Sequence, residues 1–579
     1  TGSGARTGPA EPVEVVKTYM AGEWCDAEVH LAEDLPSGTL VEGPAIICEP
    51  VATTVVEPGW QAEVSPAGMR LTRCVPLERA VAIGTSCDPI YLEVFNNLFM
   101  SIAEQMGFTL QNTAHSVNMK ERLDFSCALF DPEGQLIANA PHMPVHLGSM
   151  GESIRTVIAR NRGAMRPGDV FVLNDPYNGG THLPDITVVT PVFDEGGEEI
   201  IFYVGSRGHH ADVGGSSPAS MPPDSTVVEE EGVLIDNFRL VEHGRFKEGE
   251  MMDLLTGAAY PARSPAANVA DLRAQIAANE KGAAELQRAV AQFSLPTVQA
   301  YMRHVQDNAE EAVRRAIGAL RGGSFEYPMD NGAVVRVKVS VDAESRGAVV
   351  DFEGTSPQQP NNFNAPSAVC RAAVMYVFRT LVDDDIPMNE GCLKAIDLRI
   401  PEGCMLRPVA PAAVVAGNVE TSQVVTDALY GALGIMGAAQ GTMNNVTFGD
   451  GGLQYYETVC GGSGAGPDFH GTDAVHTHMT NSRLTDPEVL EHRFPVLVED
   501  FSVRRGSGGA GRWHGGDGAV RRLRFLAPMT ISLLANRRVV PPYGMAGGEP
   551  GAPGRSYLVR ASGSREDLAS CDQKEVRPG

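Results

Sequence analysis

Two short glycine-containing segments, each directly after an apolar run, constrain the fold of this chain more than any other feature. Residues 174–185 (NDPYNGGTHLPD) separate the apolar runs 170–173 and 186–189. Residues 206–215 (SRGHHADVGG) follow the apolar run 200–204. Glycine tolerates backbone conformations that other residues avoid, so each segment is typical of a tight connection beside a strand. The pattern predicts successive strands whose ends carry polar side chains.

Each segment contains a histidine and an aspartate three residues apart. His182 and Asp185 form the first pair, and His209 and Asp212 form the second. Imidazole nitrogens combined with carboxylate oxygens suit Zn, Mn or Fe, whereas sites built of oxygen alone suit Mg or Ca. The sequence therefore predicts a four-ligand site for a divalent metal, and it leaves the identity of the metal open. Taken singly, each of these residues could instead cap a loop or bond the backbone.

Five further residues are candidates for proton transfer. His142 and His146 precede the first segment, and either could shuttle protons or join the ligands. His210 follows a predicted ligand and could support it or face a substrate. Glu420 and Glu457 lie in Asn- and Gly-rich loops, where a carboxylate could act as a general base or bind an ammonium group. An ordinary polar role remains the alternative for each.

The polar residues of two loops are candidates for substrate binding. They are Asn174 and Asp175 in the first loop and Asn418, Thr421 and Ser422 in the second.

Charge and motifs exclude several classes of function. The chain has 46 Lys and Arg against 72 Asp and Glu, a net charge of −26, which argues against nucleic acid or an anionic membrane as the main partner. No segment reaches the ~20 apolar residues needed to span a bilayer. The ten cysteines form no CxxC pair, which favours a reducing cytoplasm. No Walker-type lysine, GxGxxG turn or GxSxG nucleophile motif occurs, so neither a nucleotide site nor a covalent mechanism has support.

The rest of the pattern predicts a small β-rich module and one large domain. Residues 13–73 contain short apolar runs separated by Pro and Gly, with strands expected over 41–48, 52–56 and 60–64. Residues 74–87 are expected to be a linker. Residues 88–579 are expected to form a large, multi-layer domain of mixed α/β (α+β) class.

Within the large domain, a helix is predicted to begin at Asp88 and to end at Gly107, with Ile90 and Val94 at the start of its apolar stripe. Two long helices are predicted over 271–293 and 297–320, broken at Pro296. Strands are expected over 124–130, 186–189 and 200–204.

Longer segments throughout residues 88–562 resemble the hydantoinase B / 5-oxoprolinase family. The matching segments are NAPHMPVHLGSM (139–150), GGTHLPDITVVTPVF (179–193), SRGHHADVGG (206–215), GNVETSQ (417–423), MNNVTFG (443–449) and HTHMTNSRLTDPEVLE (476–491). Residues 13–73 are similar to the C-terminal end of the hydantoinase A half. Both parts on one chain resemble a fused ATP-dependent 5-oxoprolinase, and the resemblance implies a hydantoinase-B-like fold for the large domain.

The resemblance implies ring opening of 5-oxo-L-proline to L-glutamate, driven by ATP. In this family the hydantoinase A half, an actin-like ATPase that uses ATP with Mg, phosphorylates the lactam oxygen, and the B half delivers water to the activated carbon. We expect the four predicted ligands to hold the metal hydroxide that attacks. The implied partners are the ATPase half and further copies of the chain.

Two departures from the family pattern shape these expectations. Nearly all of the A half is absent from the sequence, so the chain by itself is not expected to turn over ATP. The glycine-rich tail that usually closes B halves is also missing after Gly579, and both ends suggest a fragment of a longer protein. The alternatives are the B subunit of an N-methylhydantoinase or of a ketone carboxylase, or a noncatalytic assembly subunit.

Overall fold

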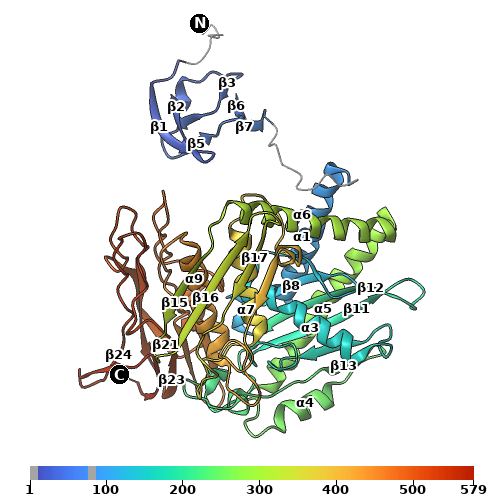
Figure 1. The fold of residues 1–579 in the computed structure, drawn as a ribbon. Coiled ribbons are helices and arrows are strands. Elements are labelled where there is room, and N and C mark those ends of the chain that lie inside the picture. Colours follow the sequence, from blue (N-terminus) through green and yellow to red (C-terminus); the bar gives the residue numbers. More distant parts are fainter. Residues whose placement is uncertain (1–10, 76–86, 579) are drawn as a thin grey trace. The chain divides into compact units, whose positions relative to one another are not determined.

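The computed structural model describes residues 11–75 and 87–578, and the chain divides into two compact units, residues 1–80 and 81–579 (Figure 1). The first unit is built mainly of strands. The second combines long helices with several sheets. The fold is therefore mixed α/β, as predicted.

The first unit consists of two small sheets, with strand orders β1-β2-β4-β5 and β3-β6-β7. The strands are β1 Glu14–Met20, β2 Glu23–Leu31, β3 Leu40–Glu42, β4 Ala45–Cys48, β5 Thr53–Val56, β6 Trp60–Ser65 and β7 Gly68–Arg73. Their inward positions form a small core of Leu35, Val41, Ala45, Ile47, Val56 and Ala62.

One strand prediction in this unit was wrong. The apolar run 41–48 is not continuous, since β3 and β4 belong to different sheets and the chain turns between them at Gly43 and Pro44. A side chain at Gly43 would place its Cβ only 1.9 Å from the carbonyl oxygen of Glu57, so the close approach requires glycine. The linker predicted over 74–87 falls mainly on residues 76–86, which lie outside the described residues.

The second unit is organised around a seven-stranded antiparallel sheet with the order β14-β13-β10-β11-β12-β8-β9. Its strands are β8 Phe125–Phe130, β9 Leu136–Asn139, β10 Val170–Leu173, β11 Asp185–Phe193, β12 Ile200–His209, β13 Phe238–Glu242 and β14 Arg245–Phe246. The predicted strands 186–189 and 200–204 are present, but β11 and β12 run further. Polar and small residues end the apolar runs without ending the hydrogen-bonded pairing.

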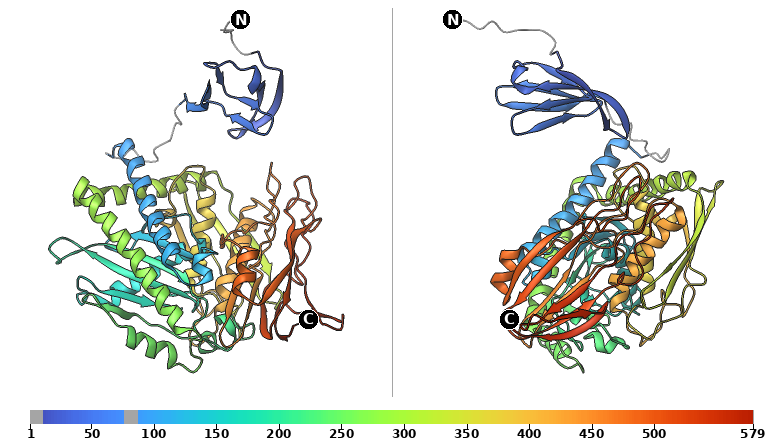
Figure 2. Two further views of the ribbon diagram at one scale, coloured as in Figure 1. Left: turned by 180° about the vertical axis from the view of Figure 1, so that it is seen from behind. Right: turned by 90° about the vertical axis from the view of Figure 1, so that its left-hand side faces the viewer.

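Helices cover both faces of this sheet. Alternate residues of a strand point to opposite faces, and in β8 Cys127 and Leu129 face α1 (Pro89–Thr113) and α5 (Pro265–Phe293), whereas Ala128 and Phe130 face α3 (Pro144–Asn161). Seen from behind, α1 and α5 run side by side across the sheet (Figure 2).

Helix α1 begins as predicted and ends later. Asp88 caps it by accepting hydrogen bonds from the backbone N–H groups of Ile90 and Tyr91. The predicted stop at Gly107 was wrong, because the helix continues to Thr113 and the glycine instead makes room for His142. The predicted apolar stripe was also partly wrong, since Ile90 is 74 % exposed.

The two predicted long helices are α5 and α6 (Leu295–Ala319). The chain breaks at Ser294, whose φ is +71°, and Pro296 lies in the first turn of α6, where its missing N–H carries no penalty. The predicted apolar stripe of α6, from Val298 to Ile317, is buried.

The remaining elements pack beside the large sheet (Figures 1 and 2). Two four-stranded sheets have the orders β15-β16-β17-β18 and β20-β19-β23-β26, and two hairpins pair β21 with β22 and β24 with β25. The strands are β15 Gly323–Pro328, β16 Val334–Asp342, β17 Gly347–Asp351, β18 Ile396–Arg399, β19 Asn445–Gly449, β20 Gln454–Thr458, β21 Val496–Arg504, β22 Gly518–Phe525, β23 Met529–Leu534, β24 Ser556–Val559, β25 Arg565–Leu568 and β26 Cys571–Val576.

The other helices connect these sheets. They are α2 Val117–Lys120, α4 Glu248–Thr256, α7 Ser367–Thr380, α8 Gly391–Lys394, α9 Ser422–Leu433 and α10 Pro487–Arg493, with short 3-10 turns at Pro218–Ser220 and Val228–Glu231. A further 3-10 turn, Ala32–Asp34, lies in the first unit. One π-helical turn, Gly417–Thr421, leads directly into α9. Helices α3, α7 and α9 share the largest apolar core of the unit.

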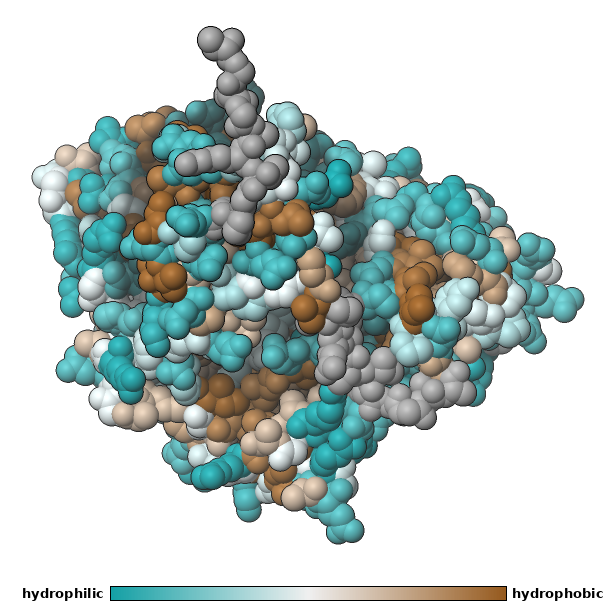
Figure 3. All heavy atoms as spheres, turned by 90° about the horizontal axis from the view of Figure 1, so that it is seen from above, coloured by the Kyte–Doolittle hydropathy of each residue, from teal (hydrophilic) through white to brown (hydrophobic). Residues whose placement is uncertain are grey.

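Hydrophilic side chains cover much of the face shown in Figure 3 and interrupt its apolar patches. Over residues 11–75 and 87–578, none of the helices is both long enough and apolar enough to cross a bilayer.

Candidate metal centre

Strand pairing brings the two predicted histidine–aspartate segments together. β11 and β12 are antiparallel neighbours, and their register places Asp185 directly opposite His209. His182 lies on the tight turn that precedes β11. In that turn a Cβ on Gly180 would lie 2.2 Å from the carbonyl oxygen of Asn174, so only glycine fits. The open end of the β11–β12 hairpin therefore carries both histidines beside one carboxylate.

The carboxylate of Asp185 is the centre of this cluster. Its Oδ2 lies 3.0 Å from Nε2 of His182 and 3.1 Å from Nε2 of His146, and its Oδ1 lies 3.2 Å from Nδ1 of His209. All four side chains are buried, with at most 2 % of each exposed. His146 is the third residue of α3, so the cluster joins the first turn of that helix to the ends of β11 and β12.

The cluster has spare ligand atoms. Nδ1 of His182 and Nε2 of His209 are buried, and neither has a polar partner in the described part of the chain. Burying polar atoms without partners is costly, so such atoms usually mark a place where something else binds. Ligand atoms of His182, Asp185 and His209 all lie within 4.8 Å of one another. Imidazoles with a carboxylate fit a divalent metal such as Zn, Mn or Fe.

The charges of the cluster are balanced inside the core. Burial alone would raise the pKa of Asp185, but His146 and His182 hold that pKa well below its ordinary value, so the carboxylate stays ionised. Burial lowers the pKa of His209, although Asp185 opposes the shift. Behind the carboxylate, Arg207 is fully buried and donates to Thr187, Ser149 and Ser153, which fixes its position.

Asp212 does not belong to the cluster, which corrects the prediction of a fourth ligand. Its Oδ2 lies 2.8 Å from Nη1 of Arg263 and accepts from the N–H of Ala219, and its Oδ1 accepts from the N–H groups of Gly214 and Arg263. These bonds occupy both oxygens. β12 ends at His209, so the strand alternation of side chains does not continue to Asp212 and does not direct it toward the cluster.

His210 and His142 also point away from the centre. The ring of His210 bonds Gln275 and Asn268 at 3.1 Å each, which ties β12 to α5. The ring of His142 accepts the N–H of Cys127 through Nδ1 at 3.0 Å, and burial lowers its pKa to about 4. Both rings hold backbone segments in place, and the structure supports a catalytic role for neither.

The π-helical turn before α9 carries two more buried polar side chains, of which Asn418 contacts the cluster. Nδ2 of Asn418 donates to Oδ2 of Asp185 at 3.1 Å, and its Oδ1 has no partner among the described residues. Glu420, fully buried, accepts from the N–H of Met443 and from Asn445 through Oε1, while its Oε2 has no such partner. Burial raises the pKa of Glu420 to about 8. A π turn shifts the helical register, and such turns are frequent at functional sites.

The other candidates have their polar atoms engaged elsewhere. Glu457 accepts from Thr485 and lies 3.1 Å from Arg521. Asn174 bonds three backbone groups, and Asp175 accepts from Tyr177 and Asn178 in its own turn. Thr421 donates to the carbonyl of Phe363, and Ser422 donates to that of Asn418. These residues support the loops rather than offer free groups to a substrate.

Sequence reasoning missed Tyr456, which contacts the cluster, and His476, whose ring nitrogens are buried. The ring of Tyr456 stacks on His209 with 4.4 Å between centroids, and its hydroxyl donates to Oδ1 of Asn445. His476 has both ring nitrogens buried and unpartnered within the described residues, and burial lowers its pKa to about 4. The family-like segment 476–491 contains His476, but no spacing rule links either residue to β11.

Known proteins resemble this chain in sequence and in fold. Residues 88–579 match the hydantoinase B/oxoprolinase family, and residues 7–69 match the hydantoinase/oxoprolinase C-terminal domain. The chain is 46 % identical to 5-oxoprolinase 1 of Arabidopsis thaliana over 97 % of its own length and 46 % of that protein. It is 43 % identical to 5-oxoprolinase of Saccharomyces cerevisiae, covering 94 % of this chain and 45 % of the relative.

A solved structure is similar as well. The ATP-dependent caprolactamase from Pseudomonas jessenii has a TM-score of 0.77 and 24 % identity, covering 86 % of this chain and 89 % of that one. The chain spans about half the length of the curated 5-oxoprolinases that it matches. From these matches, the chain belongs to the hydantoinase B/oxoprolinase family and carries a hydantoinase/oxoprolinase C-terminal domain ahead of the hydantoinase B part.

Proposed function

We propose that this chain supplies the hydrolytic part of an enzyme that uses ATP to open 5-oxo-L-proline to L-glutamate. The observation that carries the proposal is the buried cluster around Asp185, to which Glu420 is linked through Asn445 and Tyr456. The names of the relatives give the substrate, because proteins called 5-oxoprolinase are 42–46 % identical to this chain. A cyclic amide is also a substrate that needs both water and proton transfer.

His182, Asp185 and His209 would hold a divalent metal, with His146 beside them. Their chemistry fits such an ion, since the carboxylate is ionised and the imidazoles present unpartnered nitrogens. When bound, a divalent metal polarises oxygen ligands and lowers the pKa of water to about 7. Asn418 orients Asp185 through its side-chain hydrogen bond.

Ring opening requires protons to move as well as water to add. Water adds to the amide carbon, the C–N bond breaks, and the ring nitrogen leaves as an amine, so a proton passes from water to nitrogen. Glu420 is suited to this transfer because its pKa of about 8 lets it take a proton and release it near neutral pH. Its Oε1 is held by Asn445 and its Oε2 is free to act.

An amide is a weak electrophile, so the reaction needs activation from outside this chain. Phosphorylation of the amide oxygen by a hydantoinase A-type ATPase half, using ATP with Mg and releasing ADP, would make the carbon much more reactive. Water then opens the ring at that carbon, and a second water releases the phosphate to leave the carboxylate of glutamate. This chain without that half is expected to turn over no ATP. The alternative substrates are hydantoins or ketones, on which the same scaffold could act.

The test uses a protein that contains this chain together with its ATPase half. Glutamate release from 5-oxoproline should require ATP, and Glu420→Gln should reduce it about 10²–10⁴-fold, the range for a lost general base. The control is His492→Ala, which removes an exposed histidine of α10. ATP-dependent release of an N-carbamoyl amino acid from a hydantoin, without glutamate from 5-oxoproline, would replace the proposal with a hydantoinase. A protein that binds no metal and turns over neither compound would be an assembly subunit.

A further inference from the structure

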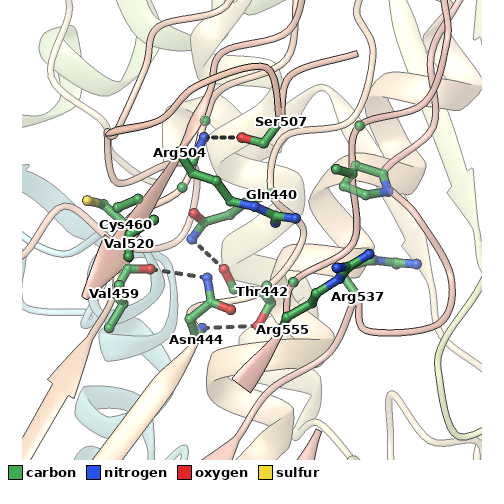
Figure 4. A pocket seen from close by; sticks show the side chains of 18 of the residues that line it. Gln440, Thr442, Asn444, Val459, Cys460, Arg504, Ser507, Val520, Arg537 and Arg555 are labelled. Carbon is green, nitrogen blue, oxygen red and sulfur yellow. Dashed lines mark hydrogen bonds between the residues drawn. The ribbon is translucent and has the colours of Figure 1, made fainter. Parts of the chain in front are cut away.

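The C-terminal part of the second unit contains an open cavity of about 1440 Å³ whose arginines the proposed reaction does not use (Figure 4). Its walls come from β19 and β20, from the hairpin of β21 and β22, from β23, and from the glycine-rich loops between them. The loops pack closely, and a Cβ on Gly462 would lie 1.9 Å from the carbonyl oxygen of Gly516. The cavity is large for a small-molecule site, since such sites usually measure about 300–1,000 Å³.

The cavity wall is positively charged although the chain is strongly acidic. Ten arginines and four glutamates line it, without any lysine or aspartate, whereas the whole chain has a net charge of −26. Three of these arginines, Arg521, Arg524 and Arg560, have a carboxylate partner. Concave surfaces with charge of one sign concentrate the electric field and attract ions of the opposite sign.

Other arginines of the wall keep unused donors. Arg537 is 1 % exposed, and its guanidinium donates to the carbonyl of Pro328 through Nη1 while Nε and Nη2 have no partner in the described chain. Arg538 bonds the carbonyl of Asn536 through Nη1, and its Nε is likewise buried without a partner. A buried guanidinium with free N–H groups can donate two parallel hydrogen bonds to the oxygens of an anion.

Arg504 and Arg555 add charge to the same cavity. Figure 4 shows both among the side chains that line it, together with Arg537. Within residues 11–75 and 87–578, none of these three guanidinium groups lies within 4.0 Å of a carboxylate oxygen. Arg504 is the last residue of β21, Arg537 lies three residues after β23, and Arg555 directly precedes β24. The positive charge therefore comes from more than one wall of the cavity.

The cavity is distinct from the cluster around Asp185. Successive residues of β20 point to opposite faces. Tyr455 and Glu457 line the cavity, whereas Tyr456 between them stacks on His209. One strand layer therefore separates the two sites.

We propose that this cavity binds a small organic molecule with two or more phosphate groups. Two oxygens of one phosphate accept two hydrogen bonds from one guanidinium. Several phosphate groups are needed to reach arginines on different walls of the cavity. The aromatic side chains of Trp513, Tyr543 and Tyr557 also line the cavity and offer an apolar surface to the organic part.

Calorimetric titration of the chain with ADP and with pyrophosphate tests this site, at about 150 mM salt so that weak surface attraction is screened. Both probes should bind saturably. Arg504→Gln combined with Arg555→Gln should weaken binding at least about tenfold, because two charge-assisted contacts are lost. The matched control is Arg336→Gln with Arg399→Gln, which removes two exposed arginines from the β15–β18 sheet and should leave the affinity unchanged.

Two further measurements separate this site from other sources of binding. A metal centre also attracts phosphate, so binding must persist in the variant His182→Ala with His209→Ala. Citrate, a carboxylate of similar charge, should bind more weakly than pyrophosphate. The proposal is overturned if neither phosphate probe saturates, if citrate binds equally well, or if both pairs of arginine substitutions have the same effect.

Discussion

The side-chain amide of Asn418 donates a hydrogen bond of 3.1 Å to Oδ2 of Asp185, although 233 residues separate them in the sequence. The contact joins the π-helical turn before α9 to the first residue of β11. It leaves Oδ1 of Asn418 buried and without a partner in the described chain. The arrangement explains why these two distant segments form a single site.

The corrected ligand set predicts the metal content of the protein. His182→Ala with His209→Ala should lose the bound divalent metal, because two of the three converging ligand groups are gone. Elemental analysis by mass spectrometry of the purified chain measures it. Asp212→Asn keeps the shape of its side chain and should retain the metal, since Arg263 and backbone N–H groups occupy that carboxylate. Metal loss in Asp212→Asn, or retention in the double variant, would contradict this assignment.

Asn418→Ala should weaken metal binding by about 10–100-fold, the usual cost of removing a group that orients a ligand. The affinity can be measured by competition with a chromogenic chelator. Thr421→Val is the matched control from the same turn, because its hydroxyl bonds only the carbonyl of Phe363 and does not reach Asp185. Equal losses in the two variants would mean that the turn, rather than the amide, is responsible.

The pH dependence of the reaction should report Glu420. As a general base this residue acts when ionised, so kcat/KM should rise with pH around about 8. In Glu420→Gln that rise should disappear along with most of the activity. An activity that falls through the same range would assign the opposite role, that of a proton donor.

Tyr456→Phe should move the rise in kcat/KM to higher pH. The Tyr456 hydroxyl holds Oδ1 of Asn445, which keeps the Asn445 amide donating to Glu420. Without the hydroxyl the amide is free to turn, and losing a bond to the carboxylate raises its pKa further. Tyr455→Phe removes a neighbouring hydroxyl that bonds Thr485, and it should leave the profile in place.

The stability of the protein should decrease as pH rises toward 8. Burial raises the pKa of Glu231 from 4.5 to about 8, although Val414, Val415 and Ser225 donate to it. The unfolded chain releases this proton near 4.5 and the folded protein only near 8, so the stabilisation is complete below 4.5 and is lost between these values.

The urea concentration at the unfolding midpoint should differ between about pH 6 and about pH 9, and Glu231→Gln should reduce that difference. Part of the dependence should remain, because the pKa of Glu420 is raised in the same direction. An unchanged difference in the variant would show that Glu231 is ionised in the folded protein.

Local patterns were sufficient for many of the elements and for part of the site. Apolar runs located β10 and β11 on either side of His182 and β12 ahead of His209, and the helical stripe from Val298 to Ile317 is buried as its spacing requires. These features depend on neighbouring residues, whose spacing determines which face they share. The pairing of β11 with β12 also follows from short-range connection, and it places Asp185 beside His209.

Tertiary structure decided the rest, because it depends on which distant segments meet. Asp212 has the same spacing from a histidine as Asp185, yet Arg263, far along the chain, binds its carboxylate. His146 joins the cluster only because α3 packs on the sheet, and Asn418 joins because a π turn directs its side chain there. The raised pKa of Glu420 likewise reflects complete burial. Sequence alone thus determined which chemical groups are present, while packing and desolvation determined which of them act together.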